Sequence, residues 1–467
     1  MSTIFDLTAR LLAYQVGRAI PTRRSSALMA DPFPAFAIAP IRMVAEQVVY
    51  ALAYGDPDGE PEIALTWNPL ERDARFLEPF AAALDRYLSD CVSAGEMPRV
   101  WLAHAAALEV IELLGHRYRT NRSVGPELQR MGAQCRLLAE ETTFAGQQIV
   151  AIAGILLAGH VATGQSPSED LHLGALLAWI SPPAGTAIAD AAAQAALEPA
   201  AAMLARAADD RVEELRERVA RGRLSEARAR VEAEAIIREE ALREWALLVR
   251  ARRAFWDLGL AQGPELTRLA AESLGRVAWQ IDRNYGSPAR PRSLAQRLDE
   301  LTYAEELAAY ADVADDPIAR AAALNAGRVL DATVLQRDQP RRGFQPCTLT
   351  LETRQDVLRV RPGTQLQLRG ARVVGRVTEV REVNAGQATQ ITLAVTTGVR
   401  NPQLPAPGQR TDWMEPEPAD LRYQKRQVYE RMAASADARV FGDTLPPSAQ
   451  LQPADDDLAT IARKLRR

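Results

Sequence analysis

Few side chains in this sequence have the types and spacing that enzymes use for catalysis. The chain has four histidines and three cysteines, and its only lysines are Lys425 and Lys464. A phosphate-binding P-loop needs a lysine directly after a glycine, and neither lysine follows one. The Gly-x-Ser-x-Gly, His-Glu-x-x-His and Gly-x-Gly-x-x-Gly motifs are also missing from the sequence. We therefore expect neither a P-loop ATPase nor an enzyme built on these motifs.

The residue types that bind metals are too scattered to predict a metal site. A zinc ion usually takes three or four Cys, His or carboxylate ligands from close spacings. The histidines and cysteines are His104, His116, His160, His172, Cys91, Cys135 and Cys347. We therefore predict no metal and no other cofactor. The odd number of separated cysteines also argues against a secreted disulfide framework, so a reducing cytoplasm is the expected location.

One arginine and one histidine have a spacing that could serve RNA cleavage. Arg99 and His104 give an Arg-x-x-x-x-His spacing that resembles the all-helical HEPN ribonucleases. The resemblance implies that the imidazole acts as acid and base while the arginine supports the reaction at an RNA 2′-hydroxyl and its phosphate. Val100 departs from the polar residue usual after that arginine, and so short a spacing recurs by chance in an arginine-rich chain. Ribonuclease activity is therefore an alternative, and a non-catalytic protein is the main expectation.

A compact basic and aromatic cluster precedes the Gly125-Pro126 step. Its candidate nucleic-acid contacts are Arg117, Tyr118, Arg119 and Arg122. Arginine forks can grip phosphates while a tyrosine stacks on a base, which is how proteins hold single strands without reading their sequence. The other interpretation is a helix C-terminus at which the cations offset the helix dipole. Both interpretations remain open from the sequence.

A second basic set leads into a region with strand-like alternation. Its candidate nucleic-acid contacts are Arg341, Arg342, Arg359, Arg361, Arg369, Arg372 and Arg376. Small barrels with basic strands commonly bind nucleic acids. No Phe, Tyr or Trp occurs between Thr348 and Val399. We therefore expect this region to contact the phosphate backbone of a nucleic acid or to dock on a protein, and not to stack on bases.

The last residues of the sequence have the pattern of a short docking helix. Acids precede residue 458 and cations follow residue 462, which is the arrangement that a helix dipole favours. One apolar stripe is formed by Leu458, Ile461, Ala462 and Leu465. A helix this short is marginal alone and needs a groove to lie in. We predict that the stripe docks on this chain's own body or on a partner, and both remain open.

A change of periodicity near Pro340 indicates the fold class. Upstream, apolar residues recur at three- and four-residue spacings, whereas the segments 348–351, 366–368 and 390–393 alternate as strands do. The predicted fold is therefore mainly α. A multi-helix N-terminal body with a long charged helix precedes a small antiparallel β-barrel, OB-like or SH3-like, and a helical tail.

The predicted domains follow composition shifts and proline-rich breaks. They are an N-terminal helical domain at 1–165, a second helical domain at 166–336 with the charged helix at 206–253, the barrel at 347–400, and a proline-rich linker with C-terminal helices at 401–467. The apolar positions of the charged helix are sparse, so a solvated antiparallel arm is expected in preference to a coiled-coil dimer. The apolar stretch Ile149 to Gly159 is shorter than the roughly 20 residues that span a bilayer, so no membrane contact is predicted.

Together these patterns predict a non-catalytic scaffold or accessory subunit of a bacterial complex that handles nucleic acid, with antiviral defence as one such setting. The expected partner is an ATPase, helicase or nuclease subunit, and nucleic acid is contacted through arginine-rich surfaces. The 56 Lys and Arg residues are offset by 60 Asp and Glu residues, so any nucleic-acid contact must be local. Besides the HEPN-like ribonuclease, the remaining alternative is a pure protein-assembly scaffold, which would show no salt-sensitive binding to DNA or RNA.

Overall fold

The structure is a computed structural model. It describes residues 4–26, 34–43, 48–71, 73–140, 149–198, 202–262, 274–282, 291–338, 347–383, 386–421, 423–425 and 427–428. By its internal contacts the chain divides into two units, one formed by 1–286 with 304–417 and the other by 287–303 with 418–467. In the second unit Lys425 pairs with Asp299 across 2.7 Å.

A five-stranded mixed sheet lies in the first 152 residues, where an all-helical domain was predicted. Its order is β5 (Glu62–Leu65), β4 (Val49–Gly55), β3 (Phe36–Arg42), β6 (Val100–Leu102) and β7 (Val150–Ile152). Strands β3, β6 and β7 run parallel, and β3, β4 and β5 form an antiparallel meander. The prediction was wrong here because six consecutive residues of β3 and of β4 are buried, which gives continuous apolar runs instead of alternation. The protein is therefore mixed α/β.

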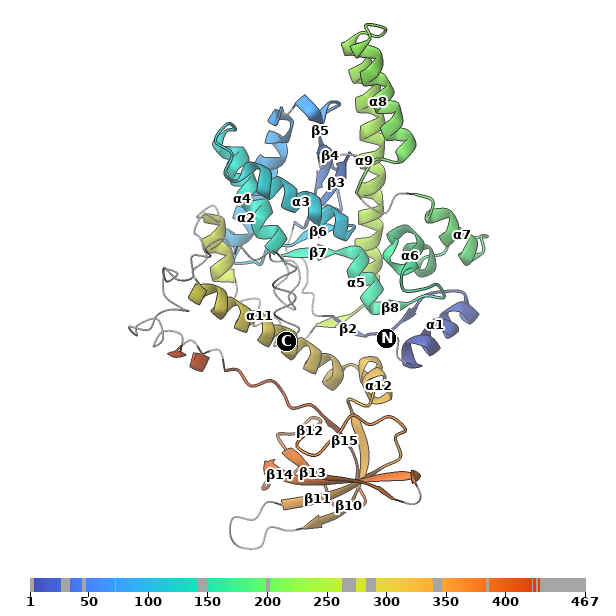
Figure 1. Ribbon diagram of the computed structural model, residues 1–467, viewed down its shortest axis with the longest axis vertical. Coiled ribbons are helices and arrows are strands. Elements are labelled where there is room, and N and C mark those ends of the chain that lie inside the picture. Colours follow the sequence, from blue (N-terminus) through green and yellow to red (C-terminus); the bar gives the residue numbers. More distant parts are fainter. Residues whose placement is uncertain are drawn as a thin grey trace, which may run out of the picture. The chain divides into compact units, whose positions relative to one another are not determined.

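Helices cover both faces of this sheet. On one face Phe36, Ile38 and Leu52 share a core with α2 (Glu78–Ala94), α3 (Ala105–Tyr118) and α4 (Pro126–Glu140). The alternate residues Ala37 and Ile41 point to the other face, where α5 (Ala153–His160), α6 (Leu173–Ile180) and α9 (Glu226–Asp257) pack. Figure 1 shows these helices on opposite sides of the strands. This second core joins residues on both sides of the predicted boundary at 165/166.

The predicted charged helix at 206–253 is a helical hairpin. Helix α8 (Arg206–Ala220) is joined to α9 by a turn in which Gly222 has a φ of 66°. The two helices run antiparallel as an arm (Figure 1). The second half of α9 is not solvated, because Leu248 and Phe255 are buried against the sheet. A single long helix was therefore wrong, whereas the antiparallel arm is present.

Smaller elements complete this part of the chain. They are α1 (Ile4–Val16), β1 (Ile20–Pro21), β2 (Ser25–Ser26), β8 (Val161–Ala162), α7 (Ile188–Ala195) and β9 (Ala261–Gln262). The apolar stretch at 149–159, which is too short to span a bilayer, divides into β7 and most of α5. Every described helix is too short or too polar to cross a lipid bilayer.

A closed six-stranded antiparallel barrel follows α11 (Pro291–Asp315) and α12 (Pro317–Asn325). Its strands are β10 (Leu330–Asp338), β11 (Cys347–Thr353), β12 (Gln365–Leu368), β13 (Val374–Val383), β14 (Ala388–Thr397) and β15 (Arg410–Met414). The predicted barrel at 347–400 contains four of them, while β10 crosses the predicted 336 boundary and β15 comes from the predicted linker. Burial alternates along β11, as the sequence pattern predicts, and Trp413 of β15 is fully buried in the barrel core.

Candidate functional site

Arg99 and His104 flank strand β6 and do not meet. Arg99 immediately precedes the strand and His104 is the N-cap of α3 behind it. Five extended residues separate Cα atoms by roughly 16 Å, at about 3.3 Å per residue. The two residues are only 2% and 5% exposed. The paired acid/base site implied by the HEPN resemblance is therefore not assembled, because a strand takes the place of the helix that would bring the two side chains together.

His104 instead contacts a buried carboxylate of α9. Its Nε2 atom lies 3.1 Å from Oε1 of Glu244, and both side chains are almost fully buried. The contact connects the start of α3 to α9 through the edge of the sheet. A substrate has no access to this pair, so we assign it a role in packing.

The described residues contain no group of three metal-binding side chains and no exposed thiol. No three His, Cys, Asp or Glu side chains converge among the residues of known position. Cys91, Cys135 and Cys347 are all buried and free. Burial raises the pKa of Cys91 to about 11 and that of Cys135 to about 12, so these thiols stay protonated at neutral pH.

Two glycines bring α3 and α4 into close contact and so shape a cavity. A Cβ atom on Gly115 would come within 2.9 Å of the backbone nitrogen of Arg136. One on Gly132 would come within 2.8 Å of the carbonyl carbon of Tyr118. Because only glycine permits this approach, α4 lies directly on the C-terminal end of α3. The loop that joins the two helices then faces the start of α2.

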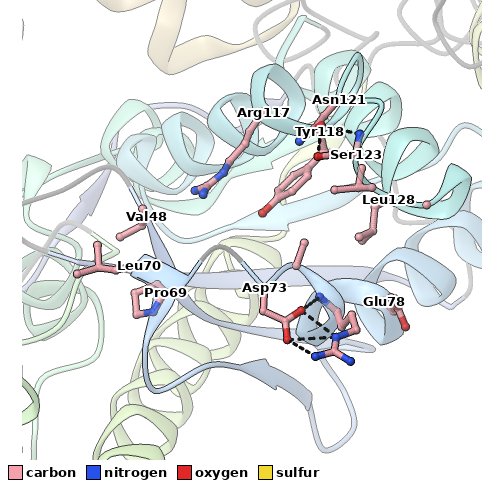
Figure 2. Close-up of a pocket in the computed structure, with 14 residues that line it drawn as sticks. Val48, Pro69, Leu70, Asp73, Glu78, Arg117, Tyr118, Asn121, Ser123 and Leu128 are labelled. Carbon is pink, nitrogen blue, oxygen red and sulfur yellow. Dashed lines mark hydrogen bonds and ion pairs between the residues drawn. The ribbon is translucent and has the colours of Figure 1, made fainter. Parts of the chain in front are cut away.

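A cavity of about 790 Å³ lies between that loop and the start of α2. It is lined by Val48, Pro69, Leu70, Asp73, Ala74, Arg75, Glu78, Arg117, Tyr118, Asn121, Ser123, Val124, Gly125 and Leu128. Figure 2 shows the side chains of Arg117 and Tyr118 directed into the space from one wall, with Asp73 on the facing wall. Residues of two distant segments, 69–78 and 117–128, therefore form one site.

Arg117 and Tyr118 are the polar groups of this cavity that have no partner in the described parts of the chain. Arg117 is half-buried, and its only recorded contact there is with the Tyr118 ring, whose centroid lies 5.8 Å from the guanidinium carbon. Tyr118 is 6% exposed, and no described residue hydrogen-bonds to its hydroxyl. Burial raises the pKa of Tyr118, so the hydroxyl remains a neutral donor.

The facing wall carries one cation, which is already paired, and two carboxylates. Asp73 accepts hydrogen bonds from Arg75 Nε, at 3.0 Å, and from Arg75 Nη2, at 2.7 Å. These bonds lower the pKa of Asp73 to about 2, so its carboxylate is ionised at any physiological pH. Glu78 lies in the first turn of α2, where a helix dipole favours an acid. Arg117 is therefore the cation of the lining that a ligand can use.

The structure separates the four residues of the first predicted cluster. Arg117 and Tyr118 line the cavity, whereas Arg119 and Arg122 are exposed and do not. The ring of Tyr118 belongs to the core, so it presents its hydroxyl and not a stacking face. Helix α3 ends at Tyr118 with Arg117 in its last turn, as the helix-terminus interpretation also predicted. Glycines inside helical patterns were the one sequence signal for the close contact that forms the cavity.

The second predicted set lies on the outside of the barrel. Arg359, Arg361, Arg372 and Arg376 are exposed, and no described carboxylate pairs with any of them. Arg369 is paired, with its Nε 3.2 Å from Asp412 Oδ2. Arg341, Arg342 and the stripe of Leu458, Ile461, Ala462 and Leu465 lie outside the described residues.

Backbone pairing gathers part of this set along one edge of β13. Arg376 is the partner of Gln365 in the β12–β13 ladder. The Arg361 segment runs beside it, because Gly363 N donates to Val377 O across 2.8 Å. Arg372 lies in the turn that joins β12 to β13. Glu379 lies further along β13, opposite Thr392, so the basic part of the strand is its N-terminal end.

Searches against protein-family models, curated proteins and solved structures found no match to this chain.

Proposed function

We propose that this protein is a non-catalytic, nucleic-acid-binding accessory subunit that holds a phosphate backbone on its barrel for an ATPase, helicase or nuclease partner. The observation that carries the proposal is the set of exposed barrel arginines, Arg359, Arg361, Arg372 and Arg376, which lack carboxylate partners in the described part of the chain. A small barrel of OB-like or SH3-like type and a bacterial cytoplasmic complex, such as an antiviral one, belong to the same proposal.

Unpaired surface arginines suit a polyanion better than they suit a folded protein surface. Each guanidinium can bind a phosphate through two parallel hydrogen bonds, and each contact releases condensed counterions. The barrel has no aromatic residue from Thr348 to Val399, so base stacking contributes nothing there. Binding is therefore expected to follow the backbone and to be independent of sequence.

The non-catalytic part of the proposal is supported by the geometry of the candidate catalytic groups. Arg99 and His104 are buried at opposite ends of β6, and His104 contacts Glu244. General acid-base catalysis requires the acting side chain within hydrogen-bond reach of the substrate. A buried imidazole that is already in contact with a carboxylate does not meet this requirement.

The test measures how salt changes the binding of single-stranded DNA and RNA. Fluorescence anisotropy of labelled single strands gives the binding constant at each salt concentration. The triple variant Arg361→Gln, Arg372→Gln, Arg376→Gln is compared with the wild type. Three lost phosphate contacts should reduce the slope of log K against log [salt] by about 2, at roughly 0.7 per contact. The control changes three exposed, ion-paired arginines of the arm to glutamine, namely Arg211, Arg221 and Arg230, and should leave the slope unchanged.

Two outcomes would replace the proposal. Strand binding that is absent, or that does not change with salt, would favour the pure assembly scaffold. Cleavage of RNA by the purified protein, lost in a folded His104→Ala variant, would favour the ribonuclease instead. Circular dichroism and a matched His116→Ala variant, whose side chain is exposed, separate loss of chemistry from loss of folding.

A further inference from the structure

We propose that the cavity between α2 and the α3–α4 loop is a binding site for a phosphate monoester of nucleotide size. The site is distinct from the barrel surface and does not depend on the function proposed for it. The phosphate would lie against Arg117, the Tyr118 hydroxyl and the first turn of α4. The remainder of the ligand would occupy the space toward Asp73 on the facing wall (Figure 2).

The hydroxyl of Tyr118, which opens into the cavity from a ring held in the core, is the observation that points to a ligand. A hydroxyl fixed in one position by its ring can donate to a ligand without a further loss of side-chain freedom. The Tyr118 ring is held in the core at 6% exposure, yet its hydroxyl faces the cavity and meets no described partner. A tyrosine that served only packing would be as stable as phenylalanine here. The hydroxyl is therefore placed to donate to an acceptor that occupies the cavity.

Two further groups favour an anion as that acceptor. Arg117 comes from the same wall and has no carboxylate partner among the described residues. Leu128 and Gly125 line the cavity as well, so the first turn of α4 forms part of its wall. Gln129 is the first residue of α4 whose backbone N–H has a carbonyl partner, Gly125 O, so the N–H groups of Glu127 and Leu128 are available to an anion.

The charges of the lining favour a single phosphate over a triphosphate. The lining contains two arginines, Arg75 and Arg117, and two carboxylates, Asp73 and Glu78, so its formal charges cancel. Arg75 is already bound to Asp73, so one guanidinium is left for the ligand. A monophosphate places the smallest charge of the phosphorylated nucleotides against this guanidinium, and its hydroxyl or amino groups could donate to the carboxylates. Each further phosphate would add repulsion from the carboxylates without another cation to bind it.

The size and the apolar part of the lining suit the rest of a nucleotide. The volume of about 790 Å³ falls within the roughly 300–1,000 Å³ typical of small-molecule sites. Val48, Pro69 and Leu70 provide an apolar part of the wall, on the side of the cavity toward which Arg117 points. The same chemistry is offered by a free nucleoside monophosphate and by the 5′-phosphorylated end of a strand.

Titration calorimetry on the full chain tests the site with four nucleoside monophosphates, the matching nucleosides and triphosphates, and a short oligonucleotide with or without a 5′-phosphate. Monophosphates should bind at least about tenfold more tightly than nucleosides, because one charge-assisted contact is added. Arg117→Gln should abolish that difference. Tyr118→Phe, which keeps the ring in the core, should weaken monophosphate binding about fivefold without lowering stability. Arg122→Gln changes an exposed arginine outside the lining and should leave binding unchanged.

Each outcome decides part of the proposal. Preference for the free monophosphate identifies a nucleotide site, and preference for the 5′-phosphorylated oligonucleotide identifies a strand-end site. Equal affinity for nucleosides and monophosphates would overturn the assignment of a phosphate. Monophosphate binding that is unchanged in both Arg117→Gln and Tyr118→Phe, or absent at millimolar concentrations, would overturn the site itself. Loss of strand binding by the barrel variants leaves this result unaffected.

Discussion

The cavity beside α3 and the outer face of the barrel use the same kind of side chain in opposite surroundings. In the cavity one half-buried arginine lies beside a tyrosine hydroxyl and a helix N-terminus, around a space of about 790 Å³. On the barrel several exposed arginines lie along adjoining segments with no enclosing wall of aromatic residues. Electrostatic attraction is stronger and less screened for partly buried charges than for exposed ones. The concave site therefore suits recognition of one small ligand, and the exposed surface suits sequence-independent binding of a long polyanion.

The two regions also differ in what holds the charged groups in place. The cavity depends on helix contacts that only glycines permit, at Gly115 and Gly132. Arg376 occupies an outward position on β13, and Arg359, Arg361 and Arg372 lie in the segments that join the strands. The inward residues of the strands, such as Val377 and Leu393, fill a closed core. A small change in helix packing should therefore abolish the cavity, whereas the barrel surface should lose function only in proportion to the arginines removed.

The reactivity of three buried thiols should show whether the two regions open together. Cys91 and Cys135 belong to α2 and α4, and Cys347 belongs to β11. We expect native labelling at pH 8 to be at least about 10³-fold slower than labelling of the unfolded chain, because reaction requires opening. Peptide mapping after timed maleimide labelling gives the rate at each cysteine. Similar rates at Cys135 and Cys347 would contradict the expectation that the helical region and the barrel open independently.

The same thiols predict a loss of stability in alkaline solution. Burial raises the pKa of Cys91 to about 11 and that of Cys135 to about 12, above the unfolded value near 8.5. The unfolded chain therefore loses these protons first as pH rises. Stabilisation from the two groups is complete below about pH 8.5 and is lost as pH approaches the folded values. Urea unfolding of wild type and Cys135→Ala at pH 8 and 10 should show the smaller decline in the variant.

Salt should separate the two kinds of binding by an order of magnitude. Raising NaCl from 50 to 200 mM should weaken strand binding to the barrel about 20- to 50-fold, for three or four phosphate contacts. Binding of a monophosphate in the cavity should weaken by less than about threefold, since one enclosed charge is involved. Anisotropy and calorimetry in the same buffers make the comparison. Equal salt dependence would mean that both ligands use the exposed arginines.

Gly132→Ala should disturb the cavity and leave the barrel intact. The added methyl group would meet the backbone of Tyr118 and Arg119, and overpacking of this kind typically costs about 1–3 kcal/mol. The Gly132→Ala variant should therefore bind a monophosphate more weakly than the wild type does. Its affinity for single-stranded nucleic acid should stay within twofold of the wild-type value. Gly159→Ala is the control, because that helical glycine has open space around its Cβ position and should be neutral or stabilising by up to about 1 kcal/mol. A stable Gly132→Ala protein with normal monophosphate binding would contradict the packing argument.

The smallest expected effect compares two residues of one strand. Arg376→Gln should lower strand affinity about two- to fourfold and reduce the salt slope by about 0.7. Glu379→Gln, three residues further along β13, should raise the affinity slightly because it removes a repulsive charge. Both changes lie on exposed positions, so thermal stability should not change. If both substitutions changed the affinity equally and in the same direction, the nucleic-acid backbone would not lie along this edge of β13.

The sequence predicted the barrel and missed the sheet for one physical reason. Strand β11 is buried on one side, so its residues alternate and the period of two is visible. Strands β3 and β4 are buried on both sides, and their continuous apolar runs can equally be read as buried helix. Strand β10 was missed because it follows α12 without a proline or glycine-rich break long enough to mark a new domain.

The sequence by itself determined the scarcity of reactive side chains, the alternation that builds a barrel, and the clusters of arginine near residues 117 and 376. Only the tertiary structure decided which arginine is enclosed and which is exposed. Arg117 and Arg122 are five positions apart and chemically identical, yet only Arg117 lines the cavity. Glycines such as Gly132 were the one sequence signal for the close helix contact. The facing wall comes from residues 69–78, and the packing of that distant segment leaves no local signal in the sequence.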